Sequence, residues 1–243
     1  MTILEVQNIS MEFGGLRALG DVNFALEEGG ILGLIGPNGS GKTTLFNVIT
    51  GFLKPTSGRV MFNGEDITGH APHKACKAGI ARTFQTNRPF GTMTVSENVM
   101  VGLLNGREPV GSMKQARADA EEILALTGLE EKRLIKSGTL GIIDRKRVEL
   151  ARALGAKPKL LLLDEMMTGL NLKEIEDVMK LVQEIRRSGM TVIVVEHVMK
   201  AVLGVSDKVM VLSAGEKIFE GTPHDVINDQ QVIEAYLGEY QNA

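Results

Sequence analysis

The chain has 243 residues, of which 43% are hydrophobic and 23% are charged, and its formal net charge is −3. A chain of this size can bury a full core in one or two domains, and its slightly acidic charge favours no nucleic-acid partner. No apolar run reaches the roughly 18 to 20 residues of a membrane-spanning helix, and no signal-peptide pattern opens the sequence, so we expect a soluble intracellular chain. The only cysteine, Cys76, lacks metal-ligand neighbours, and we interpret it as a buried structural thiol.

Hydrophobic periodicity predicts that the first part of the chain is rich in strands. We expect these strands at 3–13, 22–26, 31–35, 59–62 and just before Gln85. A helix should run from about 41 to 50. The last two strands form a further pair, separated by the turn Asn63-Gly64 and by a short helix around 73–77.

The pattern becomes helical from 94 to 154, where three amphipathic stretches follow one another. Thr94 and Glu97 predict a capping box at the start of the first helix. The second helix, 113–126, carries an apolar stripe that we interpret as core, formed by Met113, Ala116, Ala120, Ile123 and Leu124. We therefore expect a helical subdomain over 88–155, set into an α/β core formed by 1–87 and 156–243.

Strands resume at 160–163 and 191–195, joined by a helix over 172–187, which predicts a parallel βαβ unit. The segments 209–212 and 217–219 flank the turn Ala214-Gly215 and predict a hairpin. Residues 223–237 should form two short helices.

The loop from Gly36 to Thr43 fits the phosphate-binding pattern G-x-x-x-x-G-K-[ST], with an apolar strand before it and a helix after it. Its glycines permit backbone N–H groups to point at an anion, and the following helix adds its positive end. Lys42 is suited to bridge the β- and γ-phosphates, and the Thr43 hydroxyl is suited to bind Mg²⁺. A plain glycine turn is the alternative, and the loop alone does not distinguish kinases, GTPases and transport ATPases.

Two carboxylates follow the buried-strand pattern Leu160 to Leu163. Ligands sit at the carboxyl ends of parallel strands, so Asp164 can hold Mg²⁺ through water and Glu165 can polarise an attacking water. His197 directly follows the next strand, and adjacent parallel strands should bring it to the same edge as Glu165. Alone, neither His197 nor Gln85 would indicate function.

With these elements in this order, the chain resembles the ATP-binding subunits of ABC transporters over essentially its whole length. The resemblance implies an α/β P-loop NTPase core of the ABC ATPase type, with an antiparallel β subdomain and a helical subdomain. It assigns Gln85 as the Q-loop residue near the metal, Asp164 and Glu165 as Walker B, and His197 as the switch histidine. Phe13 would stack on adenine. The implied nucleotide-binding loop comprises Gly36, Pro37, Asn38, Gly39, Ser40, Gly41, Lys42, Thr43 and Thr44.

Within that family, the segments 82–90, 93–98, 221–223 and 232–238 look like subunits of branched-chain amino acid importers. The implied function is ATP hydrolysis, with ATP and Mg²⁺ bound, that powers import of branched-chain or related amino acids. The implied partners are membrane-spanning permease subunits, a second ATP-binding subunit that is often a paralogue, and indirectly an external solute-binding protein. Such a subunit would lie on the cytoplasmic face of the cell membrane.

The sequence departs from the family at the signature motif, usually LSGGQ, which here reads Leu140-Gly141-Ile142-Ile143-Asp144. Branched side chains resist the positive dihedral angles that glycine allows, and Asp144 would place a negative charge near a phosphate. In the family's ATP-sandwiched dimer the signature completes the opposing subunit's site, so this departure favours a heterodimer.

A helical pattern continues after the signature, so its N-terminal dipole should survive. We interpret the run Arg145-Lys146-Arg147 as a solvated helix face and Met166-Met167 as local packing. Two alternatives remain open: a nucleotide-binding regulatory module with little turnover, and a non-transport ABC ATPase acting on DNA or ribosomes. The second would predict a long coiled-coil insertion or tandem ATPase units, which the sequence lacks.

Overall fold

The computed structural model describes residues 1–84 and 89–241, so Gln85 lies outside the described residues. The strands are β1 (Thr2–Phe13), β2 (Leu16–Glu27), β3 (Ile31–Ile35), β4 (Ser57–Phe62), β5 (Glu65–Asp66), β6 (Ile80–Arg82), β7 (Leu160–Asp164), β8 (Thr191–Val195), β9 (Lys208–Ser213) and β10 (Glu216–Gly221). The helices are α1 (Lys42–Ile49), α2 (Pro72–Ala78), α3 (Val95–Asn105), α4 (Met113–Thr127), α5 (Ile142–Gly155), α6 (Leu172–Arg187), α7 (Met199–Val205), α8 (Pro223–Val226) and α9 (Gln230–Gln241), with the short 3₁₀ turns η1 (Glu130–Lys132) and η2 (Ser137–Thr139). Among these described helices, none combines the length and the apolar composition that crossing a bilayer requires.

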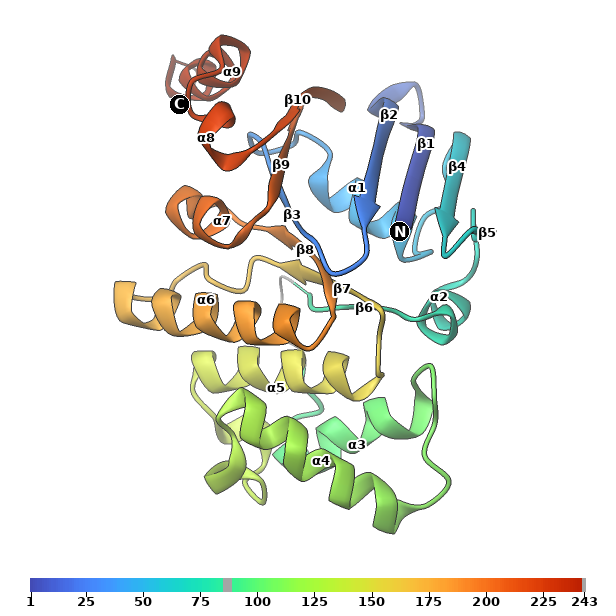
Figure 1. Ribbon diagram of the computed structural model, residues 1–243, viewed down its shortest axis with the longest axis vertical. Helices are drawn as coiled ribbons and strands as arrows, with labels where there is room; N and C mark the ends of the chain where they lie inside the picture. Colours follow the sequence, from blue (N-terminus) through green and yellow to red (C-terminus); the bar gives the residue numbers. More distant parts are fainter. Residues whose placement is uncertain (85–88, 242–243) are drawn as a thin grey trace.

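The central sheet has the strand order β10-β9-β3-β8-β7-β6 and runs through the middle of the molecule in Figure 1. Its strands are parallel except for β10, which returns antiparallel to β9. Every residue of β3, β7 and β8 is buried, because helices cover both faces and the strands read as continuous apolar runs. On β7, Leu160 and Leu162 face the cluster that contains α1, whereas Leu161 and Leu163 face α6. The expected βαβ unit is confirmed.

The second sheet is antiparallel, with the order β2-β1-β4-β5, and stands at the upper right of Figure 1. Two expectations were wrong here. The strand β2 begins at Leu16 rather than at 22, with its first residues exposed. The expected pair β4 and β6 is divided between the sheets, because Asn63 and Gly64 both adopt positive φ and turn β4 back onto β5. The apolar β6 instead joins β7 in the buried parallel sheet.

Helices α3, α4 and α5 form their own layer at the bottom of Figure 1, packed around a separate apolar cluster. The capping box is confirmed, since Thr94 accepts from the Glu97 N–H and the Glu97 carboxylate accepts from the Thr94 N–H. The stripe on α4 is confirmed at Ala116, Ala120 and Leu124. Met113 was wrongly placed in the core: it is the first residue of α4, before the packed part of the helix, and is 60% exposed.

The C-terminal segment follows the expected order, with the hairpin β9–β10 and then two helices, of which α9 extends to Gln241 rather than 237. Cys76 is half-buried, not buried, and this partial burial raises the pKa of its thiol.

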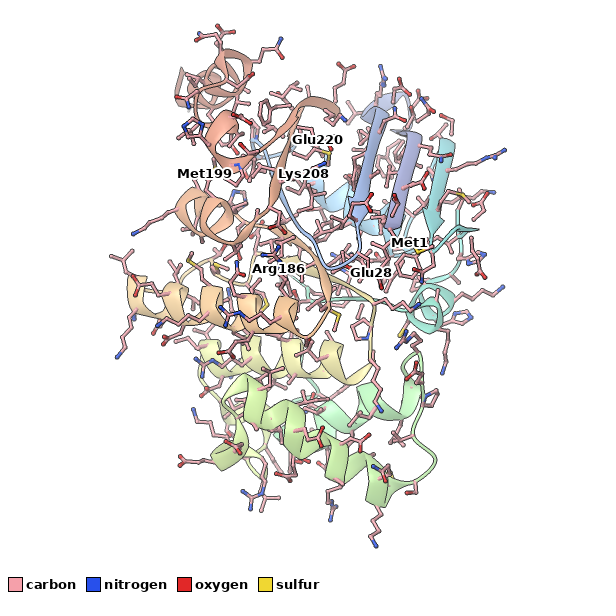
Figure 2. All side chains as sticks on the ribbon, viewed as in Figure 1. Met1, Glu28, Arg186, Met199, Lys208 and Glu220 are labelled. Atoms are coloured by element: carbon pink, nitrogen blue, oxygen red, sulfur yellow. The ribbon has the colours of Figure 1, made fainter. Side chains whose placement is uncertain are left out.

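A polar contact ties the end of α6 to the starts of two central strands. Arg186, labelled in Figure 2, has its Nη2 2.7 Å from Oδ1 of Asp207, and its Nε donates to the Gly29 carbonyl at 3.3 Å. The other oxygen of Asp207 accepts the N–H of Ile31 at 2.8 Å. This contact helps to set where β3 begins, and the phosphate-loop sequence follows at the other end of that strand.

Candidate functional site

The loop from Gly36 to Lys42 leaves the carboxyl end of β3 and enters α1, as the pattern predicts. Glycine is required at two of its positions. A Cβ on Gly36, where φ is 151°, would lie 2.1 Å from the Leu212 carbonyl oxygen. A Cβ on Gly41, where φ is 104°, would lie 2.8 Å from the Ala18 carbonyl oxygen. The close approach of the neighbouring strands therefore leaves room only for glycine at these two positions. Glycine permits the backbone conformation in which N–H groups can point at an anion.

Lys42 is buried against this loop, with 7% of the residue exposed. Its Nζ donates to the carbonyl oxygens of Gly36 at 2.7 Å and Pro37 at 2.8 Å, and lies 3.4 Å from Oγ of Ser40. The positive charge is thereby held against the loop at the N-terminus of α1, where the helix dipole adds to it. This arrangement is suited to an anion.

A cavity of about 220 Å³ opens over the loop and brings most of the predicted site residues together. Its lining comprises Ala18, Asn38, Gly39, Ser40, Gly41, Lys42, Thr43, Thr44, Glu165 and His197. Phe13 does not line it and lies half-exposed at the end of β1. A larger groove of about 520 Å³ between α6 and α7 includes none of the predicted residues.

Glu165 and His197 meet at the edge of the central sheet. The parallel register pairs Asp164 with Val195, so the residues after β7 and β8 emerge side by side, as expected. Nε2 of His197 lies 2.9 Å from Oε1 of Glu165. An ionised carboxylate only accepts hydrogen bonds, so Nε2 carries the proton when Glu165 is charged.

The backbone of Glu165 is strained. Its φ is 50°, in the left-handed region, which costs a residue with a Cβ roughly 1 to 2 kcal/mol. Its N–H donates to the Val195 carbonyl at 2.9 Å. Strain of this kind persists only where surrounding contacts hold it.

Asp164 is buried beside Arg82, with Nη2 of the guanidinium 2.8 Å from Oδ2. Desolvation raises the pKa of Asp164, although the charge and hydrogen bond of Arg82 act to lower it. Burial likewise lowers the pKa of Arg82. Nη1 of Arg82 also bonds Oδ1 of Asn47 on α1 at 2.7 Å, and the Phe84 ring lies 4.7 Å from the guanidinium carbon.

Sequence reasoning missed this role of Arg82, which lies in the segment before Gln85. The available signal was a charged residue at the end of an apolar strand: β6 pairs with β7, and a buried arginine requires a carboxylate partner.

The signature segment begins a helix, as its sequence predicted. Gly141 has φ of −65° and caps α5, and Ile142 and Ile143 form the first helical turn. Within the described residues, none of the signature positions has positive φ, which agrees with the expectation that branched side chains resist that region. Asp144 is paired with Lys132 at 2.6 Å, which balances its charge locally.

The expectation of a solvated face at Arg145-Lys146-Arg147 was wrong. Arg145 bonds the carbonyl oxygens of Leu140 at 2.8 Å and Gly138 at 2.9 Å, and Lys146 is buried. Arg145 turns back onto the segment that precedes α5, whereas Lys146 bonds backbone carbonyls of the loop after β7. The expected packing of Met166 and Met167 is confirmed, since both are buried beneath α6.

A further buried carboxylate, Glu196, lies between β8 and His197 and was assigned no role from the sequence. Desolvation raises its pKa to about 7, although the Met167 N–H and the Lys146 charge act to lower it.

Known proteins match this arrangement across the chain. A family model described as ABC transporter matches residues 19–168, and one described as branched-chain amino acid ATP-binding cassette transporter matches residues 216–241. The high-affinity branched-chain amino acid transport ATP-binding protein BraF of Pseudomonas aeruginosa is 39% identical, over 98% of this chain and 98% of its own. LivG of Escherichia coli, described in the same words, is 38% identical with the same coverage. A crystal structure of the ADP conformation of an ATP-binding cassette of an ABC transporter has a TM-score of 0.90 and 36% identity, over 98% of this chain and 99% of that chain.

The chain therefore belongs to the ABC transporter family, as one of its ATP-binding cassettes. This confirms the family and the fold class that the sequence predicted. Within the family, the match at 216–241 and the two relatives are all named for branched-chain amino acid transport.

Proposed function

We propose that this chain hydrolyses ATP and that hydrolysis powers import of branched-chain or related amino acids through a membrane assembly. The observation that carries the ATPase proposal is the 2.9 Å contact between Glu165 and His197 at the rim of the phosphate-loop cavity. A general base, a histidine and an anion cradle are thereby assembled by three separate strand ends. The names of the relatives support the solute.

In this proposal the residues of the loop, Gly36 to Thr44, bind the phosphates through backbone N–H groups and through Lys42. Glu165 accepts a proton from a water whose oxygen bonds the γ-phosphorus. The bond from that phosphorus to the β–γ bridging oxygen breaks, leaving ADP and phosphate. His197 holds the Glu165 carboxylate and contacts the γ-phosphate. Phe13 provides the stacking surface for adenine.

The donor set fits Mg²⁺, which prefers oxygen ligands and keeps several waters. Thr43 lines the cavity, and Asp164 is a carboxylate at the end of the adjacent part of the sheet with one oxygen bonded to Arg82. Thr43 would bind the ion directly and Asp164 through water, with Gln85 as the further ligand. Bound Mg²⁺ supplies charge neutralisation of the phosphates.

The partners in this proposal are permease subunits, a second ATP-binding subunit and, indirectly, an external solute-binding protein, with the chain on the cytoplasmic face of the membrane. The helical subdomain, 88–155, and Gln85 would carry the coupling to the permease. Because the signature has Ile142 and Ile143 in place of glycines, the second subunit would be a paralogue that supplies an ordinary signature to this chain's own site.

The test is to co-express the chain with candidate permease subunits and a paralogous cassette, then measure complex formation and solute-stimulated ATP hydrolysis. Lys42→Ala should abolish ATP binding by this chain, whereas Glu165→Gln should preserve binding and abolish its turnover. Lys180→Ala, at an exposed position of α6, is the matched control and should change neither.

Failure of the chain to join any such complex would remove the transport proposal. Ordinary turnover by the purified homodimer, lost in Glu165→Gln, would contradict the requirement for a paralogue while leaving the ATPase proposal intact.

A further inference from the structure

The loop that follows Asp164 carries Glu165, and two buried side chains from other elements hold its backbone. One is Lys146, in the first turns of α5. The other is Glu196, which directly follows β8. Neither residue lines the cavity over the phosphate loop.

Lys146 bonds three successive parts of this loop. Its Nζ donates to the carbonyl oxygens of Glu165 at 3.0 Å, Met166 at 3.0 Å and Thr168 at 2.8 Å. A lysine ammonium has three N–H donors, so these carbonyls account for all of them. Burial removes this strongly hydrated group from water, and three backbone carbonyls take the place of its water contacts.

Glu196 holds the same loop from the other side. One carboxylate oxygen accepts the N–H of Met167 at 2.5 Å. The other oxygen, Oε2, is buried without a hydrogen-bond partner in the part of the chain that the structure describes. The charged groups that act on this carboxyl are Lys146, which favours its ionised form, and Glu165, which opposes it. Burial of the carboxyl opposes its ionised form, and the charge of Lys146 favours it.

We propose that Lys146 and Glu196 are positioning residues for ATP hydrolysis, which together keep Glu165 in its left-handed conformation and aimed at His197. This inference rests on the proposed function, because it assigns a purpose to the geometry of Glu165. The contact to the Glu165 carbonyl is the direct link, since that carbonyl belongs to the strained residue itself.

The contacts of Lys146 with the loop have a second consequence, because of where Lys146 lies. Lys146 lies on α5, the helix that begins within the signature motif and packs in the helical layer. Displacement of α5 relative to the central sheet stretches three hydrogen bonds on the loop that carries Glu165. The geometry of the general base therefore follows the position of the signature helix within the same subunit.

A purely structural role for Lys146 is the competing explanation, in which the three bonds only attach α5 to the core. The two explanations differ in what is lost. A structural attachment changes stability, whereas a positioning residue changes the rate of the chemical step while nucleotide binding is retained.

The experiment uses the full chain in the assembly in which the wild type turns over ATP, with Lys146→Met and Glu196→Ala as test variants. Lys180→Met controls for loss of one positive charge at an exposed site. Val148→Ala controls for destabilisation of the helical layer, because Val148 is buried in its apolar cluster. For each variant, kcat, KM for ATP, affinity for a fluorescent ATP analogue and Tm are measured.

We expect Lys146→Met to lower kcat on the order of tenfold to a hundredfold, the effect of misplacing a catalytic group by about 1 Å. KM and analogue affinity should stay within about twofold. Glu196→Ala should lower kcat in the same manner but less, since it removes one of the four backbone contacts.

The inference is overturned if Lys146→Met retains kcat within about twofold, or if Val148→Ala at an equal loss of Tm lowers kcat as much. Glu165→Gln separates this result from failure of the proposed function. If the wild type turns over ATP and Glu165→Gln does not, the ATPase proposal stands whatever Lys146→Met shows. If the wild-type assembly itself has no turnover, the proposed function fails.

Discussion

The segments that lead into α1 and α5 have different backbone conformations. Before α1, glycines at positive φ are pressed against neighbouring strands, and a Cβ on Gly41 would lie 2.7 Å from the Leu19 side chain. Before α5, Gly141 has φ of −65° and nothing within 4 Å of the position of a Cβ. One end depends on glycine for its shape and the other does not. The start of α5 can therefore accommodate two isoleucines, whereas the phosphate loop requires its glycines.

The largest effect on stability is expected at Arg82. This side chain connects α1 to the sheet, because it bonds both Asn47 and the buried carboxylate of Asp164. Arg82→Met leaves that carboxylate unpaired and should lower the free energy of unfolding by about 4 kcal/mol. Denaturant unfolding measures this. The comparison variant is Arg186→Met, whose pair with Asp207 is more than a third exposed on both sides and should cost about 1 kcal/mol or less. Equal losses in the two variants would show that the burial of Asp164 does not matter.

A glycine exchange tests the two helix ends directly. Gly41→Ala forces a Cβ into the left-handed region and against the Ala18 carbonyl, and should weaken ATP binding by about 3 kcal/mol, or roughly a hundredfold. Gly141→Ala is the matched change at α5 and should alter binding by this chain less than about twofold. Titration with a fluorescent ATP analogue measures both. Similar affinities for the two variants would remove the contrast.

The pH dependence of stability tests the loop held between α5 and β8. Glu196 ionises near 4.5 in the unfolded chain and near 7 in the folded one, so the folded state keeps a proton that the unfolded state has lost. Its contribution to stability is therefore full below about pH 4.5 and is lost as pH rises to about 7, by about 3 kcal/mol at most.

Glu196→Gln keeps an acceptor for the Met167 N–H but cannot ionise. Its stability relative to the wild type should rise between pH 5 and pH 8, as measured by denaturant unfolding at each pH. A constant difference across that range would contradict the raised pKa.

The smallest effect is expected at the start of α5, where Lys132 pairs with Asp144 and is partly exposed. Lys132→Ala should lower the free energy of unfolding by less than about 1 kcal/mol, and high salt should reduce the difference. Thermal unfolding at low and high salt measures this. A loss that high salt leaves unchanged would indicate that packing, not charge, holds Lys132.

The sequence predicted the parts of this molecule that local pattern determines. Apolar runs located β3, β7 and β8, and the parallel order of β7 and β8 placed Glu165 beside His197. The roles assigned to the site residues stay predictions, including that of Gln85.

The parts that were missed depend on contacts between distant segments. Arg145-Lys146-Arg147 is indistinguishable from an exposed charged face until α5 is docked on the loop after β7. The partner of Arg82 lies on another strand, and no spacing in the sequence connects them. In each case tertiary packing, not local preference, decided the outcome.

The place of β3 in the central sheet has a consequence for how the chain folds during synthesis. Its neighbours are β8 and β9, so Ile31 pairs with Val192 and Leu32 pairs with Lys208. In a nascent chain, β3 therefore has no partner strand in this sheet until β8 and β9 have been synthesised. Such long-range parallel pairing forms slowly, and an unpaired apolar strand is prone to aggregation until it has formed. We therefore expect the nucleotide site to form only after β8 and β9 have been made, although the phosphate loop precedes both strands in the chain.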